Sequence, residues 1–517
     1  MKALILQSVQ RYKLFGYKQS IVIVLKNLHL VQNTLNKKLH LVKIIYDKNL
    51  HFVKNCIFAD TIISGLNNMK RKIYSQLLEW KKQENGRVAL LIEGARRVGK
   101  SYIVEEFAKN EYRSYILVDF SHISNNVKAV FDNYLNETET FLMFLQNVTG
   151  VTLYPRNSLI IFDEVQKYPQ ARQAIKHLVA DGRYDYIETG SLVSIHENTK
   201  DILLPSEERS ISMYPMDFEE FLWAMGDDMT MPFLRQCLID RMPLGPMHQK
   251  TLTLFRQYVI VGGMPQAVLE YLASHNFLRV DKVKRDILAL YRRSIDKYAK
   301  GYKEKVKAVF DQLPGELQKH EKRFRLSDLS SDARYRSYES SFIWLQEAMI
   351  TNMCYGVTEP QVGMRLKRDG QTFKCYMSDT GLLISHAFDE KTIQGEELYQ
   401  KLLLNKLEIN AGMLVENVVA QMFVASGHKL YFYSKNTREN AEDRMEIDFL
   451  IEKPTLTNAH NICPVEVKSG KNYTFSSLNK FRRKFADQTA TPYVVHYQDY
   501  KEEDGIVFLP IYMVPLI

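Results

Sequence analysis

The chain has 517 residues, of which 45% are hydrophobic and 25% charged. One hydrophobic core does not serve a chain of this length, so we expect roughly three or four domains. The composition is that of an ordinary globular protein and excludes disordered and fibrous classes. No apolar run approaches the ~20 residues of a membrane span, and no export signal follows Met1, so the sequence predicts no membrane partner.

The five cysteines are scattered, without a CxxC pair or a Cys/His cluster. This spacing indicates neither a zinc site nor a disulfide framework. Free cysteines are typical of a reducing compartment, so we expect a cytoplasmic protein.

The basic charge of the chain is concentrated before Met69. Residues 1–68 hold ten Lys/Arg and two Asp, a local charge of +8, so only +1 of the total +9 remains for residues 69–517. Two interpretations stand: a basic N-terminal extension, or translation that begins at Met69. The second is favoured because nothing in the segment pairs with the domain that follows. The overall charge is therefore weak evidence for nucleic-acid binding.

Residues 69–225 are predicted to form an α/β domain. A helix from Met69 leads to an apolar strand at 88–93, a glycine-rich loop and a helix at 102–110. Further apolar strands are expected at 114–120, 158–165 and 184–191. Continuous apolar strands that alternate with helices are typical of a parallel sheet with helices on both faces.

The rest of the chain divides into a helical lid, a winged helix, a linker and a small α/β domain. Three helices and a hairpin around Arg368-Asp-Gly370 favour the winged helix. In the last domain, a helix at 412–426 precedes strands at 429–434, 446–451 and 462–468. The predicted bounds are 226–302 for the lid, 303–385 for the winged helix, 386–410 for the linker and 411–517 for the α/β domain.

The glycine-rich loop has the pattern of a phosphate-binding loop. Glycines let backbone N–H groups turn toward phosphate, Lys100 supplies charge, and Ser101 offers a hydroxyl to Mg²⁺. A strand before it and a helix after it provide the required context. Arg96 and Arg97 could contact phosphate or be solvated. The predicted ATP-binding residues of the loop are Gly94, Ala95, Arg96, Arg97, Val98, Gly99, Lys100 and Ser101.

Two carboxylates near the end of strand 158–165 complete the predicted ATPase site. Asp163 can hold the Mg²⁺ shell together with Ser101, and Glu164 can polarise the attacking water. Thr189, at the end of the next strand, could sense the γ-phosphate or form a simple turn. Arg209 could neutralise the transition state, either in cis or in trans; action in trans would require a homo-oligomer. The alternative is that Arg209 forms a surface salt bridge.

A second group of chemical residues lies in the last domain. Glu416, Asp448 and Glu466 could hold Mg²⁺ or Mn²⁺, and Lys468 at i+2 from Glu466 shares its sheet face. The catalytic prediction here is Asp448, Glu466 and Lys468. The alternative is an ordinary half-solvated strand with alternating charges.

Several motifs together resemble a family of prokaryotic AAA-like ATP-binding proteins with a P-loop NTPase core. The resemblance is carried by the loop, Leu159 to Gln166, Thr189-Gly-Ser, Tyr258 to Pro265, Ser378-Asp-Thr-Gly-Leu and the Glu-Ile-Asp…Glu-Val-Lys series. It implies ATP and Mg²⁺ as ligands, a winged helix, and a C-terminal domain similar to PD-(D/E)XK nucleases.

Two functions are compatible with these motifs. In the first, ATP hydrolysis gates a metal-dependent nuclease that acts on DNA through the winged helix. In the alternative, the protein is a regulatory switch ATPase whose C-terminal domain only binds a partner or nucleic acid. Basic residues of the predicted wing would face phosphate in either case; they are Arg365, Lys367, Arg368 and Lys374.

Overall fold

The computed structural model describes residues 69–191, 206–319, 323–329, 334–388, 396–403, 411–436, 442–453, 455, 457–470 and 473–517. The basic segment 1–68 and residues 389–395 and 404–410 of the predicted linker lie outside this part of the chain. The described residues belong to one compact unit, which spans residues 65–517. None of the described helices is both long and apolar enough to cross a bilayer.

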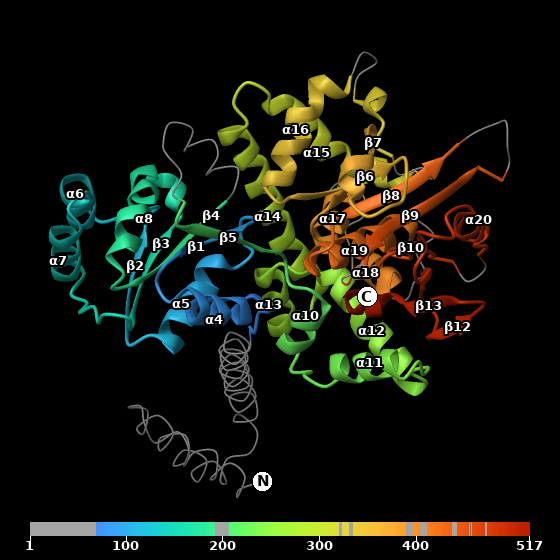
Figure 1. The fold of residues 1–517 in the computed structure, drawn as a ribbon, viewed down its shortest axis with the longest axis horizontal. Helices are drawn as coiled ribbons and strands as arrows, with labels where there is room; N and C mark the ends of the chain where they lie inside the picture. The colour runs from blue at the N-terminus through green and yellow to red at the C-terminus, as the bar shows by residue number, and fades with distance from the viewer. Residues whose placement is uncertain are drawn as a thin grey trace, which may run out of the picture. The chain divides into compact units, whose positions relative to one another are not determined.

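A five-stranded sheet forms the framework of the N-terminal part (Figure 1). The strands are β1 (Ala89–Gly94), β2 (Ser114–Asp119), β3 (Ser158–Asp163), β4 (Asp185–Gly190) and β5 (Glu208–Met213). Their order is β2-β3-β4-β1-β5, and every neighbouring pair is parallel. The sequence predicted the first four strands but missed β5, because this edge strand is half exposed and carries no continuous apolar run.

Helices cover both faces of this sheet, as predicted. On one face, α4 (Ile73–Glu84) and α5 (Lys100–Glu111) share a core with Leu90 and Ile92 of β1. On the other, α6 (Asn125–Tyr134), α7 (Thr138–Thr149) and α8 (Pro169–Asp181) pack with Leu91. The short helix η2 (Val165–Lys167) follows β3. The predicted α/β class with a parallel P-loop sheet is therefore confirmed.

A helical segment follows β5. It consists of α10 (Phe218–Ala224), α11 (Thr230–Ile239), α12 (Pro246–Val261), α13 (Pro265–Ser274) and α14 (Phe277–Tyr298). The first of these helices begins at a capping box, in which Asp217 accepts from the backbone of Glu220 and Glu220 accepts from that of Asp217. Helical structure in the region predicted as a lid is thus observed.

A second, eight-stranded sheet occupies the C-terminal part (Figure 1). Its order is β12-β13-β11-β10-β9-β8-β6-β7. The strands are β6 (Thr351–Val357), β7 (Arg368–Met377), β8 (Leu430–Lys435), β9 (Met445–Glu452), β10 (Ile462–Val467), β11 (Tyr493–His496), β12 (Lys501–Glu503) and β13 (Ile506–Pro510). The helices of this part are α15 (Lys303–Gln318), η3 (Leu326–Asp328), α16 (Tyr335–Glu347), η4 (Met364–Lys367), α17 (Thr380–Ala387), α18 (Glu396–Leu403), α19 (Ala411–Ala425), α20 (Ser476–Lys484) and η5 (Ile511–Leu516).

The hairpin assigned to the wing differs from the prediction in two respects. Strand β6 pairs in parallel with β8, so the hairpin extends the C-terminal sheet. Arg368, Asp369 and Gly370, expected at the turn, lie in β7, and the connection runs through residues 358–367. This connection contains Pro360 and Gly363, residues that favour turns, and Gly363 has a left-handed φ of +78°. The domain bounds 303–385 and 411–517 stay predictions, but one sheet joins the two segments.

Two of the quoted motifs meet directly in the core. Gly263 donates its N–H to Asp379 (2.5 Å) and accepts from the N–H of Met216 (2.7 Å). A Cβ on Gly263 would lie 2.1 Å from the Met216 carbonyl, and one on Gly381 would lie 2.5 Å from the Cα of Gly262. Only glycine permits this approach of three backbone segments. The junction links the segment after β5 to α17 and the C-terminal sheet.

Candidate ATPase site

The phosphate loop joins β1 to α5. Gly94 has no room for a side chain, since a Cβ would lie 2.6 Å from the carbonyl oxygen of Met213, and Gly99 has a left-handed φ of +101°. Lys100 is buried, and its ammonium donates to the carbonyl oxygens of Gly94 (2.9 Å) and Ala95 (3.1 Å). The ammonium that would meet a bound phosphate is thus held by the loop's own carbonyls.

The start of α5 and the ends of β3 and β4 bring oxygen ligands together beside the loop. The hydroxyl of Ser101 donates to Asp163 Oδ1 (2.8 Å), and the hydroxyl of Thr189 donates to the same oxygen. Burial raises the pKa of Asp163, although these two donors oppose the shift. A hydroxyl and a carboxylate next to a phosphate loop are the protein ligands that Mg²⁺ uses together with waters and substrate phosphates. The residues present fit a Mg²⁺ site.

The residue after Asp163 is held in an uncommon backbone conformation. Glu164 has a φ of +56°, which costs a non-glycine residue about 1–3 kcal/mol unless its surroundings fix it. Its N–H donates to the hydroxyl of Thr189 (3.3 Å), and its carboxylate accepts from Nε2 of Gln166 (2.6 Å). The buried Gln166 was assigned no role from the sequence. It orients the carboxylate that we expect to act on water.

Burial lowers the pKa of Lys100 to about 8, although Glu164 and Asp163 oppose part of this shift. An ordinary lysine has a pKa of about 10.4, so in the free protein Lys100 loses its proton at a pH about two units lower than an ordinary lysine does. Bound phosphates would favour the charged form and raise this pKa. The loop is therefore electrostatically incomplete until an anion enters it.

Nucleotide binding is expected to take up a proton at alkaline pH. Above pH 8 the free protein holds Lys100 mostly neutral, and bound phosphate restores the charge, so uptake should approach about one proton near pH 9 and almost vanish near pH 6.5. Calorimetric titration in two buffers of different ionisation enthalpy measures this number. Lys284→Met is the matched control. Burial also lowers the pKa of Lys284 to about 8, but its ammonium donates to the Ile260 carbonyl and is not part of the phosphate loop, so this substitution should leave the proton uptake unchanged. Absence of uptake at pH 9 would contradict the prediction.

The arginines considered for phosphate contacts have different positions. Arg96 contacts two tyrosines of α14. Arg97 has a left-handed φ of +69° within the loop. Arg209 forms an exposed ion pair with Glu84 (2.5 Å) and lies level with Leu90, four residues before the loop end of β1. The structure thus places Arg209 away from the loop of its own chain, as the surface salt-bridge alternative anticipated.

The predicted C-terminal metal cluster does not assemble. The carboxylates of Glu416 and Asp448 each lie 3.7 Å from the ammonium of Lys374, and that of Glu446 lies 3.1 Å from it. Glu466 instead pairs with Lys468 (2.6 Å). Among the described residues, no three His, Cys, Asp or Glu side chains gather in a way that could hold a metal ion.

A bulge in β9 explains why the carboxylates separate. Tyr431 pairs with Leu450 but Tyr433 with Ile447, so β9 has one residue more than β8 between these pairs. Ile447 consequently packs with α20, whereas Phe449 packs with α19. One carboxylate oxygen of Asp448 lies 3.7 Å from the ammonium of Lys374, and the other accepts from the N–H of Val467 (2.8 Å). Because Val465 faces the same core as Phe449, its neighbour Glu466 points to the opposite face.

Lys374 was expected on an exposed wing but is buried, with 1% of its side chain accessible. The three carboxylates raise its pKa against the effect of burial. Lys374→Met should lower the free energy of unfolding by about 3–5 kcal/mol, because it leaves buried carboxylates without their cation. Chemical denaturation measures the change.

Lys367→Met is the matched control. Lys367 is part of the same hairpin but exposed, and it pairs only with the exposed Glu359, so its loss should change stability by less than about 0.5 kcal/mol. Equal stability of Lys374→Met and the parent would contradict the assigned role of Lys374.

The parallel sheet, the phosphate loop and the strand-end carboxylates define a P-loop AAA-like ATPase domain. Consistent with this, residues 86–222 match the family described as AAA domain. Residues 252–392 match a domain of unknown function (DUF8612), and residues 411–514 match another (DUF4143). No curated protein matches the chain significantly.

Solved structures give only distant likenesses. A Walker-type ATPase of Pyrococcus abyssi is 15% identical, with a TM-score of 0.36, and the match covers 62% of this chain and 95% of that one. The ORC1 protein of Aeropyrum pernix in complex with DNA is 10% identical, with a TM-score of 0.27 over 63% and 94% of the chains. The ORC2 protein of the same organism in its ADP form is 11% identical, with a TM-score of 0.26 over 65% and 92%.

Proposed function

We propose that the protein binds ATP and hydrolyses it. The observation that carries this proposal is the convergence of Lys100, Ser101 and Asp163 at the carboxyl ends of parallel strands, where ligands of such sheets bind. Mg²⁺ held by Ser101 and Asp163 would neutralise charge on the phosphate oxygens. Lys100 holds the phosphates, Glu164 accepts a proton from the attacking water, and Thr189 supports the carboxylate of Asp163.

We also propose that nucleotide state is transmitted to the C-terminal part, which binds a target and does not cut it. The contact of Gly263 with Asp379 supports transmission, because it ties the segment after β5 to α17. The position of Lys374 among the carboxylates supports binding over cleavage, since its ammonium lies where these side chains would hold a metal. This favours the regulatory switch over the nuclease.

DNA is the proposed target. The β6–β7 connection carries Arg365 and Lys367, and Arg368 begins β7; Leu366 in the connection is 88% exposed. Two of the three cations have partners, because Lys367 pairs with Glu359 and Arg368 lies 3.2 Å from the ring centre of Tyr355. Arg209 pairs with Glu84 of its own chain, so any action of Arg209 on the transition state would require the loop of a second copy in a homo-oligomer.

The test is Mg²⁺-dependent ATP hydrolysis by the purified chain, measured with and without double-stranded DNA. Turnover that requires Mg²⁺ supports the ATPase, and stimulation by DNA that weakens with salt supports the target. Absence of turnover under all conditions contradicts the proposed ATP hydrolysis. Turnover that DNA does not change contradicts DNA as the target.

A further inference from the structure

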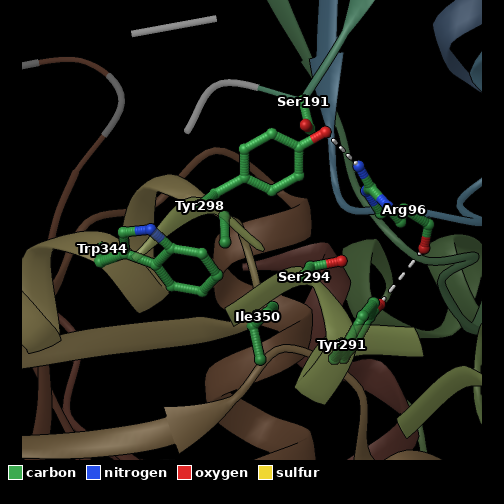
Figure 2. A pocket seen from close by; sticks show the side chains of 8 residues that line it. Arg96, Ser191, Tyr291, Ser294, Tyr298, Trp344 and Ile350 are labelled. Carbon is green, nitrogen blue, oxygen red and sulfur yellow. Dashed lines mark hydrogen bonds between the residues drawn. The ribbon is translucent and has the colours of Figure 1, made fainter. Parts of the chain in front are cut away.

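A pocket lies between the phosphate loop and the helices α14 and α16 (Figure 2). Arg96 of the loop and Ser191, directly after β4, form one wall. Tyr291, Ser294 and Tyr298 follow one face of α14 at helical spacing, and Trp344 of α16 lies across from the loop. The pocket is therefore lined jointly by the proposed ATPase site and by elements that lead to the C-terminal part.

Helix α14 holds Arg96 at two atoms. The guanidinium Nη2 donates to the phenol oxygen of Tyr298 (3.2 Å), and the backbone carbonyl accepts from the phenol of Tyr291 (3.3 Å). Figure 2 shows both contacts on the loop side of the pocket. Burial alone would raise the pKa of Tyr298, but the nearby charges of Arg96 and Lys297 outweigh it and the pKa is lowered. The cation thus lies close to the phenol oxygen.

The side-chain contact and the backbone contact respond differently to a bound phosphate. Arg96 is the third residue of the phosphate loop, so its guanidinium belongs to the segment that would surround the phosphates of a nucleotide. A hydrogen bond from a guanidinium to a phosphate joins two opposite charges and is often bidentate, whereas a hydrogen bond from a guanidinium to a phenol has charge on the donor alone. The neutral phenol of Tyr298 is the weaker acceptor. The carbonyl of Arg96 cannot bind an anion, so the contact with Tyr291 persists.

We propose that Tyr298 and the γ-phosphate of ATP compete for the guanidinium of Arg96, so that the triphosphate, and not the diphosphate, releases the end of α14. This inference rests on the proposed ATPase function and names the regulation of that site. ADP leaves Arg96 on Tyr298, because it lacks the competing acceptor. Release of Tyr298 changes the pocket on the side that Trp344 lines, which passes the nucleotide state toward α16.

Tyr298→Phe tests this competition. It removes the phenol oxygen and keeps the ring, so affinity for a non-hydrolysable ATP analogue with Mg²⁺ should rise about two- to tenfold, the usual range for one lost competing hydrogen bond. Affinity for ADP should stay unchanged. Tyr291→Phe is the matched control, since its hydroxyl touches only the backbone of Arg96; it should not alter the ratio of the two affinities. Calorimetric titration of the parent and the two variants with each nucleotide gives all six affinities.

The outcomes separate the two proposals. A parent chain that binds neither nucleotide would overturn the ATPase function and this inference with it. A parent that binds both, with an unchanged ratio of affinities in Tyr298→Phe, overturns the competition alone. Trp344 gives an independent readout: its fluorescence should change with the ATP analogue but not with ADP, and Trp344→Phe should abolish that change. Equal changes with both nucleotides count against the proposal.

Discussion

Lys100→Ala is expected to lower the affinity for ATP by at least about thirtyfold. The ammonium is the buried cation at the centre of the phosphate loop, where it donates to the carbonyls of Gly94 and Ala95. Removing one partner of a buried, hydrogen-bonded charge pair costs about 2–5 kcal/mol, which corresponds to roughly a 30- to 5,000-fold loss. Calorimetric titration with Mg²⁺ and ATP measures the change.

Stability distinguishes a lost ligand from a damaged fold. Burial lowers the pKa of Lys100, which means that the charged ammonium destabilises the folded free protein. The Lys100→Ala variant should therefore unfold at an unchanged or slightly higher denaturant concentration. Lys109→Ala is the matched control on the same helix, since Lys109 is exposed and pairs only with Glu105 and Glu106. An unchanged ATP affinity in Lys100→Ala would refute the central proposal.

The phosphate loop could be predicted because its information is local. A buried strand, two glycines with special backbone requirements and a helix that begins at Lys100 follow each other within about twenty residues, and the structure reproduces this order. The carboxylates Asp163 and Glu164 were placed for the same reason. Strands of a parallel sheet end at one edge, so residues that follow them meet there.

The C-terminal part depends on pairings that no local pattern contains. Parallel pairing of β6 with β8 joins residues about eighty positions apart and converts the predicted wing into part of a larger sheet. The alternation rule correctly placed Glu466 and Lys468 on one face, as their ion pair shows. In β9 the rule is interrupted, because one inserted residue reverses the phase of every side chain beyond it.

Glu164→Gln is expected to keep ATP binding and to lose turnover about 10²- to 10⁴-fold, the range attributed to a positioned general base. The amide has the size of the carboxylate and can still accept from Nε2 of Gln166 through its oxygen. The left-handed backbone is held by the contact of its N–H with Thr189, which the substitution leaves in place. The variant therefore keeps the geometry and loses only the ability to accept a proton.

Single-turnover and steady-state hydrolysis, together with calorimetric ATP affinity, separate the two effects. Glu105→Gln is the matched control, an exposed acid on α5 whose loss should change neither quantity. Hydrolysis by Glu164→Gln at the parental rate would place the base at another residue. Loss of ATP affinity in step with turnover would assign Glu164 to the structure of the loop, because a group that acts only on the attacking water contributes to the transition state and not to the bound ground state.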